Sequence, residues 1–305
     1  MNSATPPRPA PPAPLDPPAP LALAADSRIP IRAVAGGATT ADYDRYFHIA
    51  RHAPDLTAWT CGVLRLQAAV LADLPHTGLD DSQRAAVLTG LLHTSHATLA
   101  AWLPPVPEST PDGSGAGRPA PSDGEPVGGQ AADDGPGDAL RRWKLGHQLF
   151  HLLLTTMNST LDDTLAAVGA ARWASVRHGL ERLRTLYDAA TAAMAYASDF
   201  PASVYANDIR PTMEPPFAAP GFSGNLNQEH RVMTERTRAL TAALGELSPP
   251  APSLAVIHHE VALLRAAQRR NRKAHAAICE RCVPDGASLL RQHTTRQRSD
   301  RATCE

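Results

Sequence analysis

The sequence has few aromatic residues, which make up 5% of its 305 positions, and it has only four cysteines. Four cysteines in a chain of this length are too few for the disulfide framework of a small secreted domain. We therefore expect the protein to reside in a reducing compartment. Runs of eighteen or more apolar residues are lacking, and the N-terminus lacks a basic segment followed by an apolar one. Neither a membrane span nor a signal peptide is therefore predicted, and we expect a cytoplasmic protein.

An excess of charge of either sign is also lacking, since the formal net charge is -1. A neutral balance gives no electrostatic reason to expect nucleic acid or an anionic membrane surface as a partner. The sequence leaves the oligomeric state open, with a homo-oligomer as one option.

Composition divides the chain into a folded domain and biased segments. Residues 1–27 are rich in proline and are expected to be disordered, because they carry too few bulky side chains to bury a core. Residues 28–290 are expected to form a single helical domain. Residues 104–138 interrupt it with a segment rich in Pro, Gly, Asp and Ser, which we interpret as a disordered insertion. Residues 291–305 form a polar tail.

Apolar residues recur three and four positions apart through most of the remaining chain, and this spacing predicts helices. No alternation typical of strands is found, so the fold is expected to be all-α. Pro201 should stop one helix, and the Pro-rich stretch at 207–224 is interpreted as an ordered irregular loop. The helical segments predicted are Tyr43–Leu74 divided at Pro54, Ser82–Leu103, a segment from Ala139, Leu161–Ser198, Asn227–Leu244 and Ser253–Pro284.

The last of these helices carries His275 and Cys279. Residues four apart lie on one face of a helix, so the imidazole and the thiol could contact the same flat ligand, such as a porphyrin. Polar residues at Gln268 and Asn271 interrupt the apolar row just before His275. Either these groups face a ligand, or this half of the helix is exposed to solvent. The Cys279-x-x-Cys282 pair lacks the further ligands of a zinc site.

Other candidates have an ordinary interpretation as well as a functional one. His230 near a helix start should be neutral, which suits a ligand, an acid–base group or a surface histidine. His147 lies between Trp143 and Phe150 on an apolar face, where a hydrogen-bonded core histidine is the more common case. Arg142 is either part of a solvated face or a clamp for a carboxylate.

Five groups of residues follow one another along the chain: Asp138–His147, Tyr196–Asp199, Ile209–Pro216, Phe222–Gly224 with Glu229–His230, and His275-x-x-x-Cys279 with Ser288–Leu290. In this order they resemble the heme-dependent tyrosine and 3-methyl-L-tyrosine hydroxylases of antibiotic biosynthesis. These belong with the histidine-ligated aromatic oxygenases, such as tryptophan 2,3-dioxygenase and indoleamine 2,3-dioxygenase. The resemblance implies an all-helical bundle of the heme-dependent dioxygenase type that hydroxylates the phenol ring ortho to its hydroxyl, using hydrogen peroxide.

The resemblance also implies site residues. In the family a His-xn-His-x-x-x-Cys pattern holds the heme and the cysteine forms one thioether, which corresponds here to His230, His275 and Cys279. We favour His275 as the iron ligand and His230 as a second histidine at the heme, with a catalytic role or as a ligand. His147 is the hypothetical group that moves a proton on the peroxide.

The substrate is expected to be an aromatic amino acid, L-tyrosine or 3-methyl-L-tyrosine. Its carboxylate could be bound by Arg142 or Arg210 and its ammonium by Ser223 or Ser288. Two alternatives stay open at this point: an indole-ring oxygenase with the same fold and cofactor, and a helical binding module without chemistry.

Overall fold

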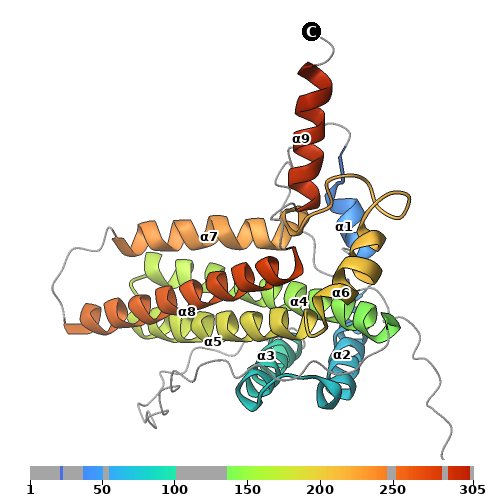
Figure 1. Cartoon of the computed structure of the whole chain (residues 1–305). Coiled ribbons are helices and arrows are strands. Elements are labelled where there is room, and N and C mark those ends of the chain that lie inside the picture. The colour runs from blue at the N-terminus through green and yellow to red at the C-terminus, as the bar shows by residue number, and fades with distance from the viewer. Residues whose placement is uncertain are drawn as a thin grey trace, which may run out of the picture.

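The chain is an α-helical bundle in the computed structural model, which describes residues 21–22, 37–50, 55–100, 136–245, 252–283 and 288–302. Helices α4, α5, α7 and α8 run side by side, α2 and α3 cover them on one side, and α9 projects away from them (Figure 1). The long helices are α2 (Leu56–Asp73), α3 (Asp81–Ala100), α4 (Pro136–Gly169), α5 (Trp173–Ala197), α7 (Gln228–Gly245), α8 (Pro252–Cys282) and α9 (Leu289–Ala302).

Short elements connect the long helices. The strands β1 (Leu21–Ala22) and β2 (Ile49–Ala50) pair in parallel, and each has only two residues. Since all other described elements are helices, the fold class is all-α as predicted. Helical turns replace the first part of the irregular loop expected at 207–224, whereas residues 214–223 are irregular as expected. The short helices are α1 (Thr40–Tyr46), η1 (Leu74–His76), α6 (Ala202–Val204), η2 (Tyr205–Ile209), η3 (Arg210–Met213) and η4 (Gly224–Leu226).

The break between α4 and α5 lies later than predicted. The segment Leu161–Ser198 was expected to be one helix, but α4 continues to Gly169 and α5 begins at Trp173. Ala171 has a positive φ of 53°, and the backbone N–H of Arg172 donates to the carbonyl of Ala167 at 2.9 Å. This is the αL helix ending that glycine usually forms. This helix ending could not be predicted from the sequence, because alanine occupies the αL position.

Other boundaries agree with the predictions more closely. Helices α1 and α2 lie on either side of the predicted division, and α3, α7 and α8 match three predicted helices. The insertion expected at 104–138 falls outside the described residues up to 135, and α4 already begins at Pro136. The arm expected at 1–27 is also outside them, except for the two residues of β1. Most of the polar tail forms α9 rather than irregular chain.

Two apolar clusters fill the interior. The larger one lies among α2, α3, α4, α5, α7 and α8, and its buried members include Leu66, Leu149, Leu183, Leu240 and Leu264. The smaller one joins α1 and the start of α4 to the turns after α5 and to the end of α8. Its buried members include Tyr43, Phe47, Phe200, Met213 and Cys282. Because α4, α7 and α8 run past the boundary between the clusters, polar side chains there can meet.

Candidate functional site

The last turns of α8 present His275 and Cys279 together. The Nε2 atom of His275 and the Sγ atom of Cys279 are 3.6 Å apart, and both side chains are exposed. This is the shared helix face that the four-residue spacing predicted. Partial burial lowers the pKa of His275 and raises the pKa of Cys279. The imidazole is therefore neutral and the sulfur is a thiol at neutral pH.

Two more histidines, from α4 and α7, converge on His275. Burial lowers the pKa of His147 to about 4, and the charge of His275 contributes to this shift. The pKa of His230 is lowered by burial and, again, by His275. Because a charge affects a pKa strongly only at short range, the imidazole of His275 lies within electrostatic range of both His147 and His230. The structure thus brings together three histidines far apart in the sequence, all of them neutral at pH 7.

Aromatic rings and one hydrogen bond fix His147. Its ring stacks on Phe47 with centroids 4.2 Å apart and lies 4.0 Å from the ring of Trp143. The Nδ1 atom is 2.8 Å from the carbonyl oxygen of Trp143. Since a carbonyl can only accept, Nδ1 carries the hydrogen and Nε2 carries the lone pair of the neutral ring. His147 is therefore oriented as a proton acceptor at Nε2.

The first turn of α7, which carries His230, is tied to α4 by a buried polar group. Asn227 accepts a hydrogen bond from the backbone N–H of His230 at 2.9 Å, as a helix cap does. Its Nδ2 atom is 3.2 Å from Nδ1 of the fully buried His151, which also lies 3.3 Å from Oε2 of Glu229. Asn158 of α4 donates to the backbone oxygen of Glu229 at 3.1 Å. These contacts position His230.

Sequence reasoning missed this anchoring role of His151. His151 follows His147 by four residues, so it lies on the same side of α4 one turn later. That spacing was the available signal, but a histidine among leucines in a long helix looks like ordinary packing. The partners Asn227 and Glu229 lie more than 70 positions away along the chain.

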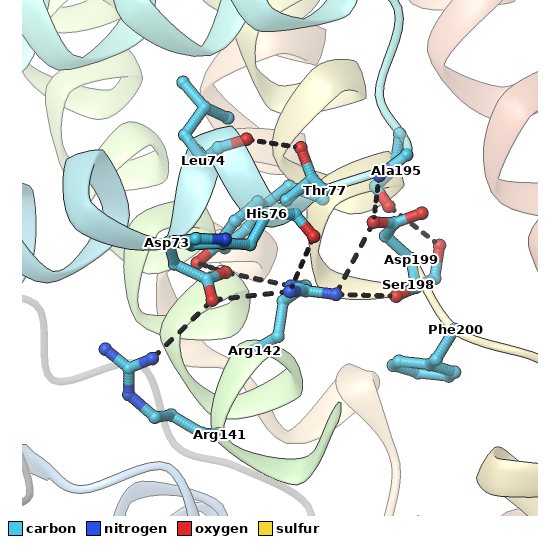
Figure 2. A network of polar contacts seen from close by, with 12 residues as sticks. Asp73, Leu74, His76, Thr77, Arg141, Arg142, Ala195, Ser198, Asp199 and Phe200 are labelled. Carbon is cyan, nitrogen blue, oxygen red and sulfur yellow. Dashed lines mark hydrogen bonds and ion pairs between the residues drawn. The ribbon is translucent and has the colours of Figure 1, made fainter. Parts of the chain in front are cut away.

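Arg142 occupies the centre of a second polar network, shown in Figure 2. Its side chain is 1% exposed, and Nε donates to Oδ2 of Asp73 at 2.8 Å. Nη1 donates to the backbone oxygen of Asp199 at 3.0 Å and lies 3.5 Å from Oδ2 of that residue. The Tyr196 hydroxyl donates to Asp73 at 2.7 Å, and Arg141 is 3.6 Å from the same carboxylate. Burial and the Asp73 charge raise the pKa of Tyr196 above its usual value.

This network changes the interpretation of Arg142. A buried charge requires partners, and Asp73 and Asp199 supply them from α2 and the end of α5. The guanidinium therefore joins three helices inside the protein, and its planar fork is already used by carboxylates of the chain. We accordingly leave Arg142 out of the substrate contacts proposed below.

The other expected substrate contacts lie in separate places. Arg210, on η3, is partly buried with its Nε 3.3 Å from Oε1 of Glu214. Ser223 caps η4 by accepting from the backbone N–H of Asn225 at 3.2 Å. Ser288 is exposed and accepts from the backbone N–H of Arg291 at 3.3 Å, at the start of α9. Ser223 and Ser288 thus both cap helices.

Pockets of about 390 Å³ lie at two places among the described residues. One lies among α5, α7 and α8, with leucine walls and with Tyr187 and Gln268 among its polar lining residues. The other lies beside α1 and η4, where Ser223, Arg231 and His293 contribute to the lining. The three histidines are not among the residues that line either of these two pockets.

A group of aromatic residues borders the site, and sequence reasoning did not find it. Tyr205 lies 5.7 Å from Trp143, centroid to centroid, and its pKa is raised to about 12 by burial and by the nearby Cys282. Tyr46 hydrogen-bonds to the Thr212 hydroxyl at 2.6 Å, and Lys144 lies 4.9 Å from the centre of the Tyr46 ring. Both phenols are therefore protonated at neutral pH.

The donor set fits a heme better than a bare metal ion. Among the described residues, no group of three or more His, Cys, Asp or Glu side chains could hold a metal ion. A heme would need few donor atoms from the chain beyond those of its own porphyrin, and the neutral imidazoles of His230 and His275 could supply them. Cys279, one turn after His275, is placed to reach the edge of such a ring.

Comparisons with known proteins agree with this chemistry. Residues 12–255 match the family described as SfmD 3-methyl-L-tyrosine peroxygenase. A 3-methyl-L-tyrosine peroxygenase of Streptomyces lavendulae is 30% identical over 159 residues, which are 50% of this chain and 40% of that protein. The chain thus matches well under half of that relative's length.

None of the described helices is both long enough and apolar enough to cross a membrane.

A solved structure supports the fold. The crystal structure of reduced SfmD, soaked with sodium hydrosulfite, superimposes with a TM-score of 0.50 at 22% identity, covering 83% of this chain and 78% of the other. The family match includes His147 and His230, whereas His275 and Cys279 lie beyond its last residue. Because the match spans most of the sequence, the chain belongs to the SfmD 3-methyl-L-tyrosine peroxygenase family.

Proposed function

We propose that this protein is a heme-dependent peroxygenase that hydroxylates the phenol ring of L-tyrosine or 3-methyl-L-tyrosine ortho to the hydroxyl group. The observation that carries the proposal is the meeting of three neutral imidazoles, from α4, α7 and α8, next to the thiol of Cys279. Family membership supplies the reaction class.

The heme would be held from two helices. His275 of α8 is the proposed iron ligand, and His230 of α7 approaches from the facing helix as the second histidine. The Cys279 thiol can add across a vinyl group of the ring, with its sulfur bonding to one carbon and its proton moving to the other. When bound, the heme supplies the oxidising chemistry, and the protein supplies orientation.

His147 is the proposed proton carrier. Its Nε2 atom is unprotonated, since Nδ1 donates to Trp143 and the pKa is lowered to about 4. Nε2 can accept a proton from peroxide and return it to the departing oxygen. The stacked Phe47 ring keeps the imidazole from rotating away. His230, held by its Asn227 cap, is fixed in the same region.

Substrate contacts fall to the partly exposed groups. With Arg142 engaged by Asp73 and Asp199, Arg210 is the remaining candidate for the amino-acid carboxylate. The Ser223 and Ser288 hydroxyl oxygens each keep a second lone pair that can accept a hydrogen bond from an ammonium group beyond their capping bonds. Peroxide is the proposed co-substrate.

Absorption spectra and product analysis test the proposal together. Protein expressed with ample heme should show a Soret band, and His275→Ala should change its ligand-field bands, whereas His258→Ala, an exposed histidine of the same helix, should not. Peroxide with L-tyrosine or 3-methyl-L-tyrosine should give a product heavier by one oxygen. Turnover of L-tryptophan instead would select an indole oxygenase, and protein without a Soret band would indicate a binding module.

Extraction of heme tests the thioether separately. Acidified organic solvent should leave heme on the wild-type chain and remove it from Cys279→Ala. Cys61→Ala, which removes another exposed thiol, should behave like wild type. Complete extraction from the wild type would refute attachment at Cys279 while leaving the histidine ligands to be judged by the spectra.

A further inference from the structure

Helices α2 and α3, which Figure 1 shows across the bundle from α7, carry a group of exposed leucines. Exposed fractions of these side chains range from 41% to 71%. Scattered exposed leucines are normal, but a contiguous apolar patch on a soluble protein marks a contact surface. The residues, which we call the leucine surface, are Leu64, Leu71, Leu88, Leu92 and Leu99.

A hydrogen bond between α2 and α3 shows where these leucines lie. Ser95 of α3 donates to Oε1 of Gln67 of α2 at 3.0 Å, so these two residues mark the seam between the helices. Leu64 and Leu71 are three residues before and four residues after Gln67. On a helix such positions form one row, and this row runs along the seam.

The same spacing recurs on α3. Leu92 and Leu99 are three residues before and four after Ser95, and Leu88 precedes Leu92 by another turn. The core-facing residues of α3, such as Val87 and Leu91, lie on the opposite side of the Ser95 row. Both leucine rows therefore flank one seam and face outward, so the leucine surface is continuous.

Charge is almost absent from this part of the molecule. From Ala85 to Ala100, α3 has no Asp, Glu, Lys or Arg, and the only charged residues of α2 are Arg65 and the buried Asp73. Depletion of charge distinguishes the centre of a protein–protein interface from the remaining surface. The opposite pattern holds for α9, which carries four arginines and an aspartate over fourteen residues.

We propose that the leucine surface is the interface through which two copies of this chain form a homodimer. The two rows follow the three- and four-residue spacing with which helices interlock in bundles, and they lie on consecutive helices joined by residues 74–80. A two-fold axis through the seam sets the hairpin of one copy against that of the other, forming a four-helix contact.

Charge and area favour a second copy over another partner. An uncharged surface does not repel an identical one, whereas binding a charged partner would call for complementary charges that α3 lacks. Five leucines exposed to this extent present roughly 500 Å² per copy, and a pair would bury roughly 1,000 Å², the lower limit of specific interfaces. Figure 1 shows α2 and α3 across the bundle from α7, so dimerisation through these two helices leaves the histidine site accessible.

Light scattering during size-exclusion chromatography tests this interface on the full-length heme-loaded protein. We expect the wild type to have twice the chain mass of 32.3 kDa at about 50 µM. Leu92→Glu and Leu64→Glu should each reduce the mass twofold while leaving helical circular dichroism and the Soret band unchanged. Val256→Glu, at an exposed apolar position of α8, is the matched control and should remain dimeric.

A mixing experiment identifies the partner. Leu92→Glu and Leu92→Lys should be monomeric alone and form a mixed dimer when combined, because opposite charges then meet across the axis. A monomeric wild type, or dimers that persist in both Leu64→Glu and Leu92→Glu, would overturn the proposal. If the wild type is monomeric and the amides of the leucine surface are protected from hydrogen exchange, another segment of the same chain covers this surface.

Discussion

The Arg142 network and the histidine site both gather polar side chains from several helices, but they differ in what they leave available. In the network, Arg142 is 1% exposed and is paired on two sides with Asp73 and Asp199. In the histidine site, His275 and Cys279 are exposed, and the neutral imidazoles do not form ion pairs with one another. One region is complete within the chain, and the other offers donors to a ligand.

The difference separates a structural role from a functional one. A cationic residue in a block that resembles a known family attracts a functional interpretation, yet pairing inside the protein shows that Arg142 stabilises the junction of α2, α4 and α5. Neutral imidazoles near a surface cost little to bury and need no carboxylate. They are therefore the groups that can exchange water for a ligand.

The largest expected effect comes from breaking the network. Arg142→Ala leaves the buried Asp73 without its main partner and should lower the free energy of unfolding by about 3–5 kcal/mol. Urea denaturation measures the change. The surface pair of Arg270 and Asp188, also 2.8 Å apart but with side chains 51% and 40% exposed, provides the control, and Arg270→Ala should cost about 1 kcal/mol or less. Equal losses in the two variants would contradict the structural role of Arg142.

Acid should weaken the histidine site next. The pKa of His147 is lowered from 6.5 to about 4, so the unfolded chain takes up the proton first as the pH falls. The contribution of this histidine is complete above pH 6.5 and is lost as the pH falls toward 4, by up to about 3 kcal/mol. The pKa values of His230 and His275 shift in the same direction.

Urea denaturation of heme-free protein at a series of pH values measures this dependence. His147→Phe, which keeps a ring between Phe47 and Trp143, should flatten the curve between pH 6.5 and 4. His258→Phe on the exposed side of α8 should leave it unchanged. A curve that stays steep in His147→Phe would show that other groups dominate.

A smaller loss is expected where α4 and α5 touch, between the two regions. A Cβ atom on Gly146 would lie 2.3 Å from the Cβ of Ala197, and helix backbone is close behind it. Gly146→Ala should therefore separate the helices and lower stability by about 1–3 kcal/mol. Gly169→Ala, which meets nothing within 4 Å, should stay within about 0.5 kcal/mol of wild type, as thermal unfolding can show.

Helical periodicity predicted the fold class and most helices, since the apolar rows of α2, α5, α7 and α8 repeat at threes and fours. Periodicity did not predict the break between α4 and α5, where Ala171 adopts the αL conformation. A glycine at this position would have indicated a helix end. Periodicity also gave no account of α9, a polar helix without an apolar row. Local patterns predict helices that bury one apolar face. They miss helix ends without a glycine and helices that have no apolar face.

For the site, spacing predicted the local pair His275 and Cys279, which the structure places 3.6 Å apart. The approach of His147 and His230 depends on how α4 and α7 pack against α8, and no local pattern encodes that. The same limit applies to Arg142, whose partners Asp73 and Asp199 are 69 and 57 positions away. The sequence was sufficient to predict individual candidate residues, but it was not sufficient to predict which residues contact them.

The smallest expected effect concerns the thiol of the open site. Burial raises the pKa of Cys279 although its side chain is exposed, so in heme-free protein it should react with iodoacetamide more slowly at pH 8 than a cysteine in a short peptide. Mass spectrometry of the α8 peptide gives the rate. His275→Ala opens the region to water, so it should bring the rate a few-fold closer to that of the peptide. An unchanged rate would mean that the imidazole does not shield the sulfur, and the open site would then be wetter than the 3.6 Å contact implies.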